Sequence, residues 1–321
     1  MSVATAIAHP NIALCKYWGK RDRALNLPSV PSLSLTVAPF FTRTTVEWGV
    51  EQDQVQLNGQ PADASTQKKV LRVLDLLDPW RPRVRVSSEN SFPTAAGLAS
   101  SSSGFAALVV AAAGAAGQKR SLTELSCLAR QGSGSAARSL FGGWVEWPLG
   151  SRMDGADSHG VPVAGPEHWD LRMVVAIVAS DRKETLSTDG MTHCELTSPY
   201  YTAWVASAPA DVEGGRAALL RRDLTALGSI MERSTLRMHA CMMSSDPPIL
   251  YWKSGTLAAY EVVRRLRKEG LPCYATMDAG PNVKVLCRAA DVEVLRLALL
   301  QVVDRVELLQ PGPGARLVPT P

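Results

Sequence analysis

An aspartate placed just before a turn is the first candidate for chemistry in this chain. Asp278 follows an apolar stretch that ends at Met277 and precedes the turn residues Gly280 and Pro281. A carboxylate at the end of a strand is held on a rigid element, which suits a general base or an orienting group. Aspartate is also common in turns, where it bonds its own backbone. Taken alone, Asp278 leaves both interpretations open, and the turn role is the commoner one.

A second candidate is the Gly/Ser segment at residues 132–138. Two hydroxyls, those of Ser133 and Ser135, stand two residues apart, and Arg138 follows three residues later. Together they can grip an oxyanion from several sides, because a guanidinium binds carboxylate or phosphate through two parallel hydrogen bonds. The alternative is a flexible Gly/Ser loop with a solvated arginine.

The richest run of small residues extends from Pro93 to Gly104 and contains four consecutive serines. Backbone N–H groups converge on an anion in such a loop, and a following helix directs its free N–H groups the same way. The segment is not a Walker A loop, because it lacks the terminal Gly-Lys-Ser/Thr. A serine-capped helix start without a ligand is the other interpretation.

A basic cluster lies near the start of the chain. Lys16, Tyr17, Lys20 and Arg21 bring three cations and a phenol into six residues, a set that can neutralise a dianionic group. One such cluster is weak evidence, since it also suits a solvated basic turn.

The histidines predict no metal site built by the protein. None of the five stands in an HExxH or other paired-ligand spacing. His239 lies among methionines and is expected to be a core or wall residue.

Hydrophobic periodicity predicts the elements that must position these groups. In the first half we expect strands, with a tight turn at Asn58-Gly59, over Thr42–Trp48, Val55–Leu57 and Val84–Ser87. We expect helices there over Ser65–Leu77 and Ala106–Ala116.

The stretch Pro148–Asp170 loses all periodicity and is interpreted as a surface connection near a domain boundary. Beyond it we expect strands over Leu171–Ala179, Cys273–Met277 and Val283–Cys287. Helices are expected over Tyr200–Ser207, Leu219–Cys241, Ser254–Glu269 and Asp291–Val303. The Gly/Pro-rich end, Gln310–Pro321, is predicted to be a loose tail. The expected domains are 1–170 and 171–321.

Composition excludes several classes of protein. Hydrophobic residues make up 46% and charged residues 20%, as in globular proteins, and a net charge of +4 is too small for a nucleic-acid partner. Six cysteines without a CxxC pair indicate a reducing compartment, and five of them lie in apolar or mixed runs that favour burial. No signal peptide is visible, and the longest apolar run, Phe105–Gly117, falls short of the about 20 residues of a membrane span. We therefore expect a cytoplasmic protein with no membrane partner.

Taken in order, the segments resemble the diphosphomevalonate decarboxylase family, in the superfamily named for galactokinase, homoserine kinase, mevalonate kinase and phosphomevalonate kinase. The specific signatures are Lys-Tyr-Trp-Gly-Lys at 16–20 and Met-Asp-Ala-Gly-Pro-Asn at 277–282, and the resemblance covers roughly residues 8 to 290. It also includes Ser187–Met191 and Thr197–Tyr200. The resemblance implies an α/β (α+β) fold of two domains, the first ribosomal-protein-like and the second ferredoxin-like.

The resemblance also implies an activity, which is ATP-dependent decarboxylation of (R)-5-diphosphomevalonate to isopentenyl diphosphate with release of ADP, phosphate and CO2. Mg²⁺ is expected with the ATP rather than in a protein cage, and a homodimer is expected. The implied catalytic residues are Asp278, Arg138 and Lys16. The implied substrate contacts are Asn11, Tyr17, Lys20, Ser133, Ser135, Arg138, Ser187 and Met191. The implied ATP contacts are Pro93, Ala95, Ala96, Gly97, Leu98, Ala99, Ser100, Ser101 and Ser102.

One loop departs from the family pattern. Where the family commonly has Leu-Pro-x-Asn-Ser-Ser-Leu-Ser, residues 27–34 carry Val30 and Pro31 in place of an asparagine and a serine. The change removes a side-chain amide and a backbone donor, so it bears on whether the substrate is a diphosphate or a monophosphate. Two alternatives remain, a kinase-only relative acting on the 3-hydroxyl of mevalonate or its phosphate, and a non-catalytic sensor of ATP or an isoprenoid intermediate.

Overall fold

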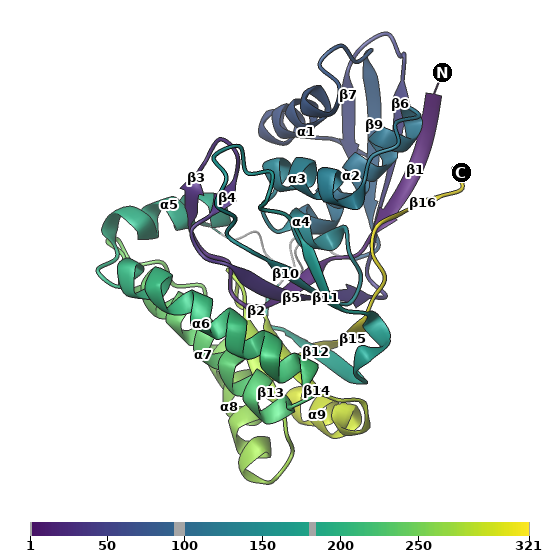
Figure 1. Ribbon diagram of the computed structural model, residues 1–321. Coiled ribbons are helices and arrows are strands. Elements are labelled where there is room, and N and C mark those ends of the chain that lie inside the picture. Colours follow the sequence, from purple (N-terminus) through teal and green to yellow (C-terminus); the bar gives the residue numbers. More distant parts are fainter. Residues whose placement is uncertain (1, 93–99, 180–183, 321) are drawn as a thin grey trace.

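The structure is a computed structural model that describes residues 2–92, 100–179 and 184–320 (Figure 1). Helices and sheets are mixed along the chain, and they form two domains around two main sheets. The predicted α/β class is confirmed.

The first sheet has six strands in the order β16-β1-β6-β9-β7-β8. Its strands are β1 (Ser2–Ala8), β6 (Thr42–Trp48), β7 (Gln54–Leu57), β8 (Gln60–Pro61), β9 (Val84–Asn90) and β16 (Arg316–Val318). The alternating burial of β6 shows why this segment forms a strand with one face on the core, because every second residue is buried. The tight turn between β7 and β8 has positive φ at both Asn58 and Gly59, as the Asn-Gly pair predicts.

Helices cover one face of this sheet (Figure 1). They are α1 (Ala64–Leu77), α2 (Ser100–Ala115), α3 (Leu122–Gly132) and the short α4 (Ala136–Ser139). The small side chains of α2 are buried nearly all round, so this helix packs directly on β1 and β6. The serine-rich start of α2 is therefore attached to a rigid layer.

The second sheet is continuous through both halves of the chain, in the order β11-β10-β5-β15-β12-β14-β13, with β2 also paired to β5. Its strands are β2 (Asn11–Cys15), β5 (Ser32–Ala38), β10 (Trp144–Trp147), β11 (Val161–Ala164), β12 (Leu171–Ile177), β13 (Tyr274–Met277), β14 (Val283–Arg288) and β15 (Arg305–Pro311). A small hairpin of β3 (Lys20–Asp22) and β4 (Leu27–Pro28) lies apart from it.

Helices pack on both faces of the C-terminal part of this sheet. On one face are α6 (Tyr201–Leu220) and α7 (Leu224–Met243), and on the other are α8 (Ser254–Lys268) and α9 (Val292–Leu299). A further helix, α5 (Ser187–Thr197), packs with α7 around a separate apolar cluster. No helix among the residues described is both long and apolar enough to cross a membrane.

Most predicted elements are confirmed, and four predictions need correction. The helix predicted over Tyr200–Ser207 is much longer, because α6 continues to Leu220. The helix predicted over Leu219–Cys241 begins only at Leu224. Leu219 and Leu220 end α6, residues 221–223 form a turn, and Asp223 caps α7. The connection Pro148–Asp170 contains β11, which pairs with β10. The predicted loose tail is wrong as well, because β16 pairs with β1 and its backbone groups find partners there. Five of the six cysteines are buried, as expected.

Candidate active site

Asp278 lies where the sequence analysis predicts, directly after β13 and on a turn closed by the Gly280 N–H donating to the Asp278 carbonyl at 2.7 Å. The turn is anchored at its far end. The buried side-chain oxygen of Asn282 accepts hydrogen bonds from the backbone N–H groups of Val178 and Ala179, at the end of β12. Asp278 is therefore held on a rigid element, while its side chain stays 30% exposed.

Lys16 binds this carboxylate from the end of β2. Its ammonium donates to Oδ1 of Asp278 at 2.6 Å and to the carbonyl of Ala13 at 2.9 Å. Its side chain is only 1% exposed. Burial lowers the pKa of Lys16 to about 8, although the neighbouring Asp278 opposes that shift.

A second lysine, which sequence reasoning missed, binds the other carboxylate oxygen. Lys284 lies on β14, and its Nζ is 2.9 Å from Oδ2 of Asp278. The signal that could have identified it is a lysine inside the apolar run Val283–Leu286. Burial raises the pKa of Asp278, but the two ammonium groups outweigh burial and hold it well below its ordinary value.

Arg138 forms the next part of the site. It is buried on α4, donates from Nε to Oδ1 of Asn11 at 3.1 Å, and also donates to Oγ of Ser32. Asn11 in turn donates to the Ser135 carbonyl at 2.9 Å and to Oγ of Ser139 at 2.7 Å. Burial lowers the pKa of Arg138 to about 10, and the charge of Asp278 opposes this shift.

The hydroxyls of the Gly/Ser segment converge with the start of α2. Oγ of Ser133 lies 3.3 Å from that of Ser135 and 3.2 Å from that of Ser101. The predicted ATP contacts Ser100, Ser101 and Ser102 all lie in the first turn of α2. The remaining predicted ATP contacts lie outside the described residues; they are Pro93, Ala95, Ala96, Gly97, Leu98 and Ala99.

Tyr17 lies against this segment. Its ring packs on that of Trp147 with 4.8 Å between the centroids, and a β-carbon at Gly134 would lie 2.8 Å from its hydroxyl. The buried Tyr17 hydroxyl has no hydrogen-bond partner within the part of the chain described. An unpaired buried hydroxyl is costly, so this group fits a polar ligand.

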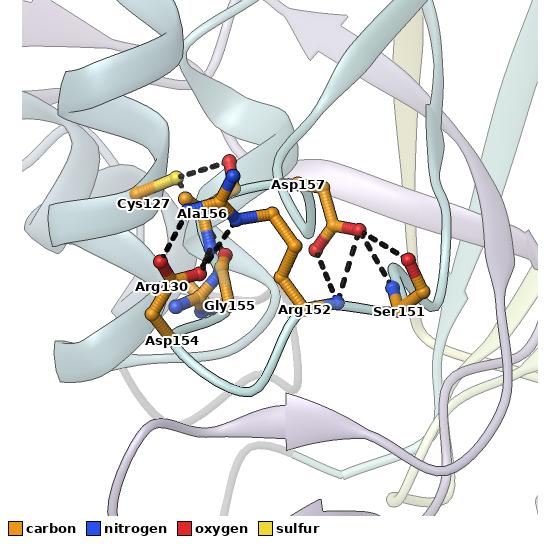
Figure 2. Close-up of polar contacts among 8 residues, drawn as sticks. All are labelled: Cys127, Arg130, Ser151, Arg152, Asp154, Gly155, Ala156 and Asp157. Carbon is orange, nitrogen blue, oxygen red and sulfur yellow. Dashed lines mark hydrogen bonds and ion pairs between the residues drawn. The ribbon is translucent and has the colours of Figure 1, made fainter.

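A second buried arginine, Arg130, lies directly before the Gly/Ser segment at residues 132–138. Arg130, near the end of α3, donates to the carbonyls of Leu25 and Gly155 at 3.0 and 2.6 Å, and also to that of Ser158. Figure 2 shows the loop that supplies the last two carbonyls, folded around Asp157, which accepts from the backbone N–H groups of Ser151 and Arg152. These carbonyl groups accept the hydrogen bonds of the Arg130 guanidinium.

Three further predicted contacts lie toward α5. Nζ of Lys20 is 3.4 Å from Oγ1 of Thr188, one residue after the predicted contact Ser187, and burial lowers the pKa of Lys20 to about 8. Met191 is buried in the apolar cluster that also contains Val30 and Trp18. Val30, the residue that departs from the family pattern, is therefore part of a packed wall.

Two cavities in the described part of the chain are lined by residues outside this site. One of about 580 Å³ is lined from α7 and includes Arg233 and Arg237, and one of about 270 Å³ is lined by Trp169 and Arg172 among others. Within residues 2–92, 100–179 and 184–320, no group of three His, Cys, Asp or Glu side chains can hold a metal ion.

The fold and the site define an enzyme that acts on an anionic small molecule, with a carboxylate fixed between cations and with hydroxyls gathered at a helix start. Two family models cover most of the chain. One is described as a diphosphomevalonate decarboxylase-like N-terminal domain and matches residues 8–160, and the other as a mevalonate 5-diphosphate decarboxylase C-terminal domain and matches residues 173–310. The chain therefore belongs to the diphosphomevalonate decarboxylase family.

Curated relatives of the same family match most of this chain. The diphosphomevalonate decarboxylase of Aspergillus fumigatus is 39% identical over 316 residues, which is 91% of this chain and 78% of the relative. That of Saccharomyces cerevisiae is 36% identical over 304 residues, which is 87% of this chain and 76% of the relative.

Solved structures of the same family superpose on nearly the whole chain. Mevalonate diphosphate decarboxylase of Staphylococcus aureus superposes with a TM-score of 0.93 at 35% identity, covering 99% of this chain and 98% of that one. A relative called MDDEF, in complex with MVAPP, AMPPCP and magnesium, has a TM-score of 0.92 at 38% identity and covers 99% of each chain.

Proposed function

We propose that this chain catalyses the ATP-dependent decarboxylation of (R)-5-diphosphomevalonate to isopentenyl diphosphate, with release of ADP, phosphate and CO2. The observation that carries the proposal is the ionised carboxylate of Asp278, fixed between Lys16 and Lys284 and influenced by the charge of Arg138. The membership of the family and the complex of MDDEF with MVAPP and AMPPCP support the choice of substrates.

The chemistry explains why the reaction needs ATP. A carboxylate leaves as CO2 only if its electron pair can be accepted elsewhere in the substrate. Phosphorylation turns the 3-hydroxyl into a good leaving group, so that loss of phosphate and loss of CO2 proceed together and leave a carbon–carbon double bond. The protein must therefore hold the hydroxyl close to the phosphoryl group and hold the carboxylate without neutralising it.

In this proposal Asp278 accepts a hydrogen bond from the 3-hydroxyl and orients it. A carboxylate with so low a pKa is a weak base, so its contribution is position rather than proton removal. Lys16 supports phosphate transfer from one side. Arg138, with Ser133 and Ser135, holds the carboxylate and diphosphate of the substrate.

The residues present fit ATP and Mg²⁺. Ser100, Ser101 and Ser102 stand in the first turn of a sixteen-residue helix, where backbone N–H groups and hydroxyls can bind phosphate oxygens. Mg²⁺ supplies charge neutralisation on those oxygens when it is bound. Since the described residues offer no carboxylate cage, the nucleotide phosphates would provide its main ligands.

The remaining assignments are proposals of the same kind. Asn11, Tyr17, Lys20, Ser187 and Met191 contact the substrate. The site lies in the cleft between domains formed by residues 1–170 and 171–321. The enzyme is a cytoplasmic homodimer. Sedimentation of the purified protein and fractionation of the source cells test the last statement.

One assay tests the function directly. The purified protein is incubated with ATP, Mg²⁺ and diphosphomevalonate, and CO2 and phosphate are expected in equal amounts. A phosphorylated product without CO2 would identify a kinase, and tight binding without ADP would identify a sensor. Mevalonate and its monophosphate are tested in parallel, because Val30 and Pro31 depart from the family pattern.

A further inference from the structure

We infer that Lys284 is a positioning residue of this active site, which keeps Asp278 ionised and correctly oriented independently of Lys16. The inference rests on the proposed function and deepens it. The sequence motifs assign no residue to the task of keeping Asp278 ionised and oriented, and the inference assigns it to Lys284.

The geometry gives each lysine its own oxygen. Nζ of Lys284 lies 2.9 Å from Oδ2 of Asp278, while Nζ of Lys16 lies 2.6 Å from Oδ1. The two lysine side chains are 2% and 1% exposed. A carboxylate bound at both oxygens cannot rotate without breaking a charge-assisted hydrogen bond, so its open face has a fixed direction.

The position of Lys284 is costly for the fold. Its neighbours Val283 and Val285 pack into the core under α8 and α9, and Leu286 packs into the core under α6 and α7. An apolar side chain at 284 would continue the second of these cores, because residues two apart share a face of the strand. A buried lysine is instead rare unless it is paired. The pair with Asp278 accounts for its presence, and packing does not.

Two lysines also allow the tasks to be divided. Lys16 is proposed to support phosphate transfer, which requires its ammonium to interact with a phosphate oxygen. If Lys16 were the only partner, Asp278 would then lose its compensating charge in a largely buried site, which is strongly unfavourable. Lys284 keeps the carboxylate paired while Lys16 engages the nucleotide.

The charged groups around Asp278 determine how its pKa changes when the charge of Lys284 is removed. Among the residues that the structure describes, the titratable or charged groups that face it are Lys16 after β2, Lys284 on β14, Arg138 on α4 and His239 on α7. Burial lowers the pKa of His239 to about 3, so this ring is neutral near pH 7. Removal of the Lys284 charge is therefore expected to raise the pKa of Asp278, since burial alone acts in that direction.

The first test compares Lys284→Met, Lys284→Gln and Lys284→Arg with wild type in the decarboxylation assay. Both uncharged variants are expected to lose about 10- to 100-fold in kcat, the effect of one charge-assisted hydrogen bond. The acid limb of their kcat/KM profile is expected to move to higher pH. Lys284→Arg is expected to restore the limb, because it restores the charge. Val285→Ala, in the same strand but on the opposite face, is the control, and it should lower stability without moving the limb.

A second measurement needs no catalytic activity. The wild-type protein is labelled at the aspartate carboxyl carbons, and the Asp278 signal is assigned by its absence in Asp278→Asn. The inference predicts that this signal does not titrate near its ordinary value of 3.8 in wild type, and that its pKa is higher in Lys284→Gln, where Lys16 alone remains. Titration near that value would overturn the inference, as would an acid limb unchanged in both uncharged variants. Failure of wild type to release CO2 would instead contradict the proposed function, while the carboxyl titration would still decide the role of Lys284.

Discussion

The carboxylates of Asp278 and Asp211 each bind two cations, but the two clusters are arranged in opposite ways. Asp278 is 30% exposed, and its partners Lys16 and Lys284 are buried. Asp211, on α6, is 2% exposed, and its partners Arg233 and Arg237 on α7 are 46% and 41% exposed. In the first cluster the anion faces the site, and in the second the cations face solvent.

The difference shows which cluster can act on a ligand. The exposed arginines donate four hydrogen bonds to the Asp211 carboxylate, at 2.7 to 3.2 Å, and so connect α6 to α7. Solvent can hydrate these arginines, so the cluster costs little and stabilises a helix pair. The buried lysines around Asp278 have no such compensation, so their cost is explained by what the carboxylate does at its open face.

The strongest test of this comparison is Asp278→Asn. The change keeps the shape of the side chain but removes the charge that both lysines bind. We expect kcat to fall by about 100-fold, the cost of misplacing a reacting group. Nucleotide affinity, measured by calorimetry with ADP, should be retained. Activity near that of wild type would remove Asp278 from its assigned role.

A smaller effect is expected from alkaline pH. Burial lowers the pKa of Lys16 to about 8, so its ammonium charge is lost above that pH. We expect kcat/KM to fall about tenfold for each pH unit above 8, as for loss of one required proton. Since Lys20 also has a pKa of about 8, the profile of Lys20→Met is the control. A limb that vanishes in this variant belongs to Lys20 instead.

The free energy of unfolding should respond to alkaline pH in the opposite direction to activity. Because Lys16 has a pKa of about 8 when folded and 10.5 ordinarily, the unfolded chain binds more protons between these values. The contribution of Lys16 to the free energy of unfolding therefore rises with pH in this window, while activity falls. Denaturant titrations at pH 8 and pH 10 measure the difference.

The smallest effect on activity is expected from Asp211→Asn. We expect the free energy of unfolding to decrease by about 1 to 3 kcal/mol, because the charge-assisted hydrogen bonds between α6 and α7 weaken. Values of kcat/KM should change by less than about twofold, since distant sites usually act independently. A large loss of turnover in this variant, with stability unchanged, would contradict the contrast between the two clusters.

The elements that carry the site were largely predictable from sequence. The strand before Asp278 shows as an apolar run ended by glycine and proline, and these residues fix the turn in the structure as well. Strand β6 was predicted with its observed bounds, because alternation is a local property.

What could not be predicted depends on contacts between distant segments. In the sequence, Lys284 is an isolated charge within a strand. Only the structure shows that Lys284 and Lys16 bind opposite oxygens of the Asp278 carboxylate. The same holds for Arg130, whose acceptors Leu25 and Gly155 come from opposite directions along the chain. No local pattern gives a buried cation its partner.

The pairing of β16 with β1 has a consequence for the synthesis of the protein. Strand β1 is made before the other strands of its sheet, yet its outer edge stays open until Arg316–Val318, more than 300 residues later, leave the ribosome. An open strand edge is a template for pairing with other chains. In Figure 1 the two ends lie near each other beside this sheet. The last strand thus closes the first sheet, and a nascent chain interrupted before it would carry an edge prone to association.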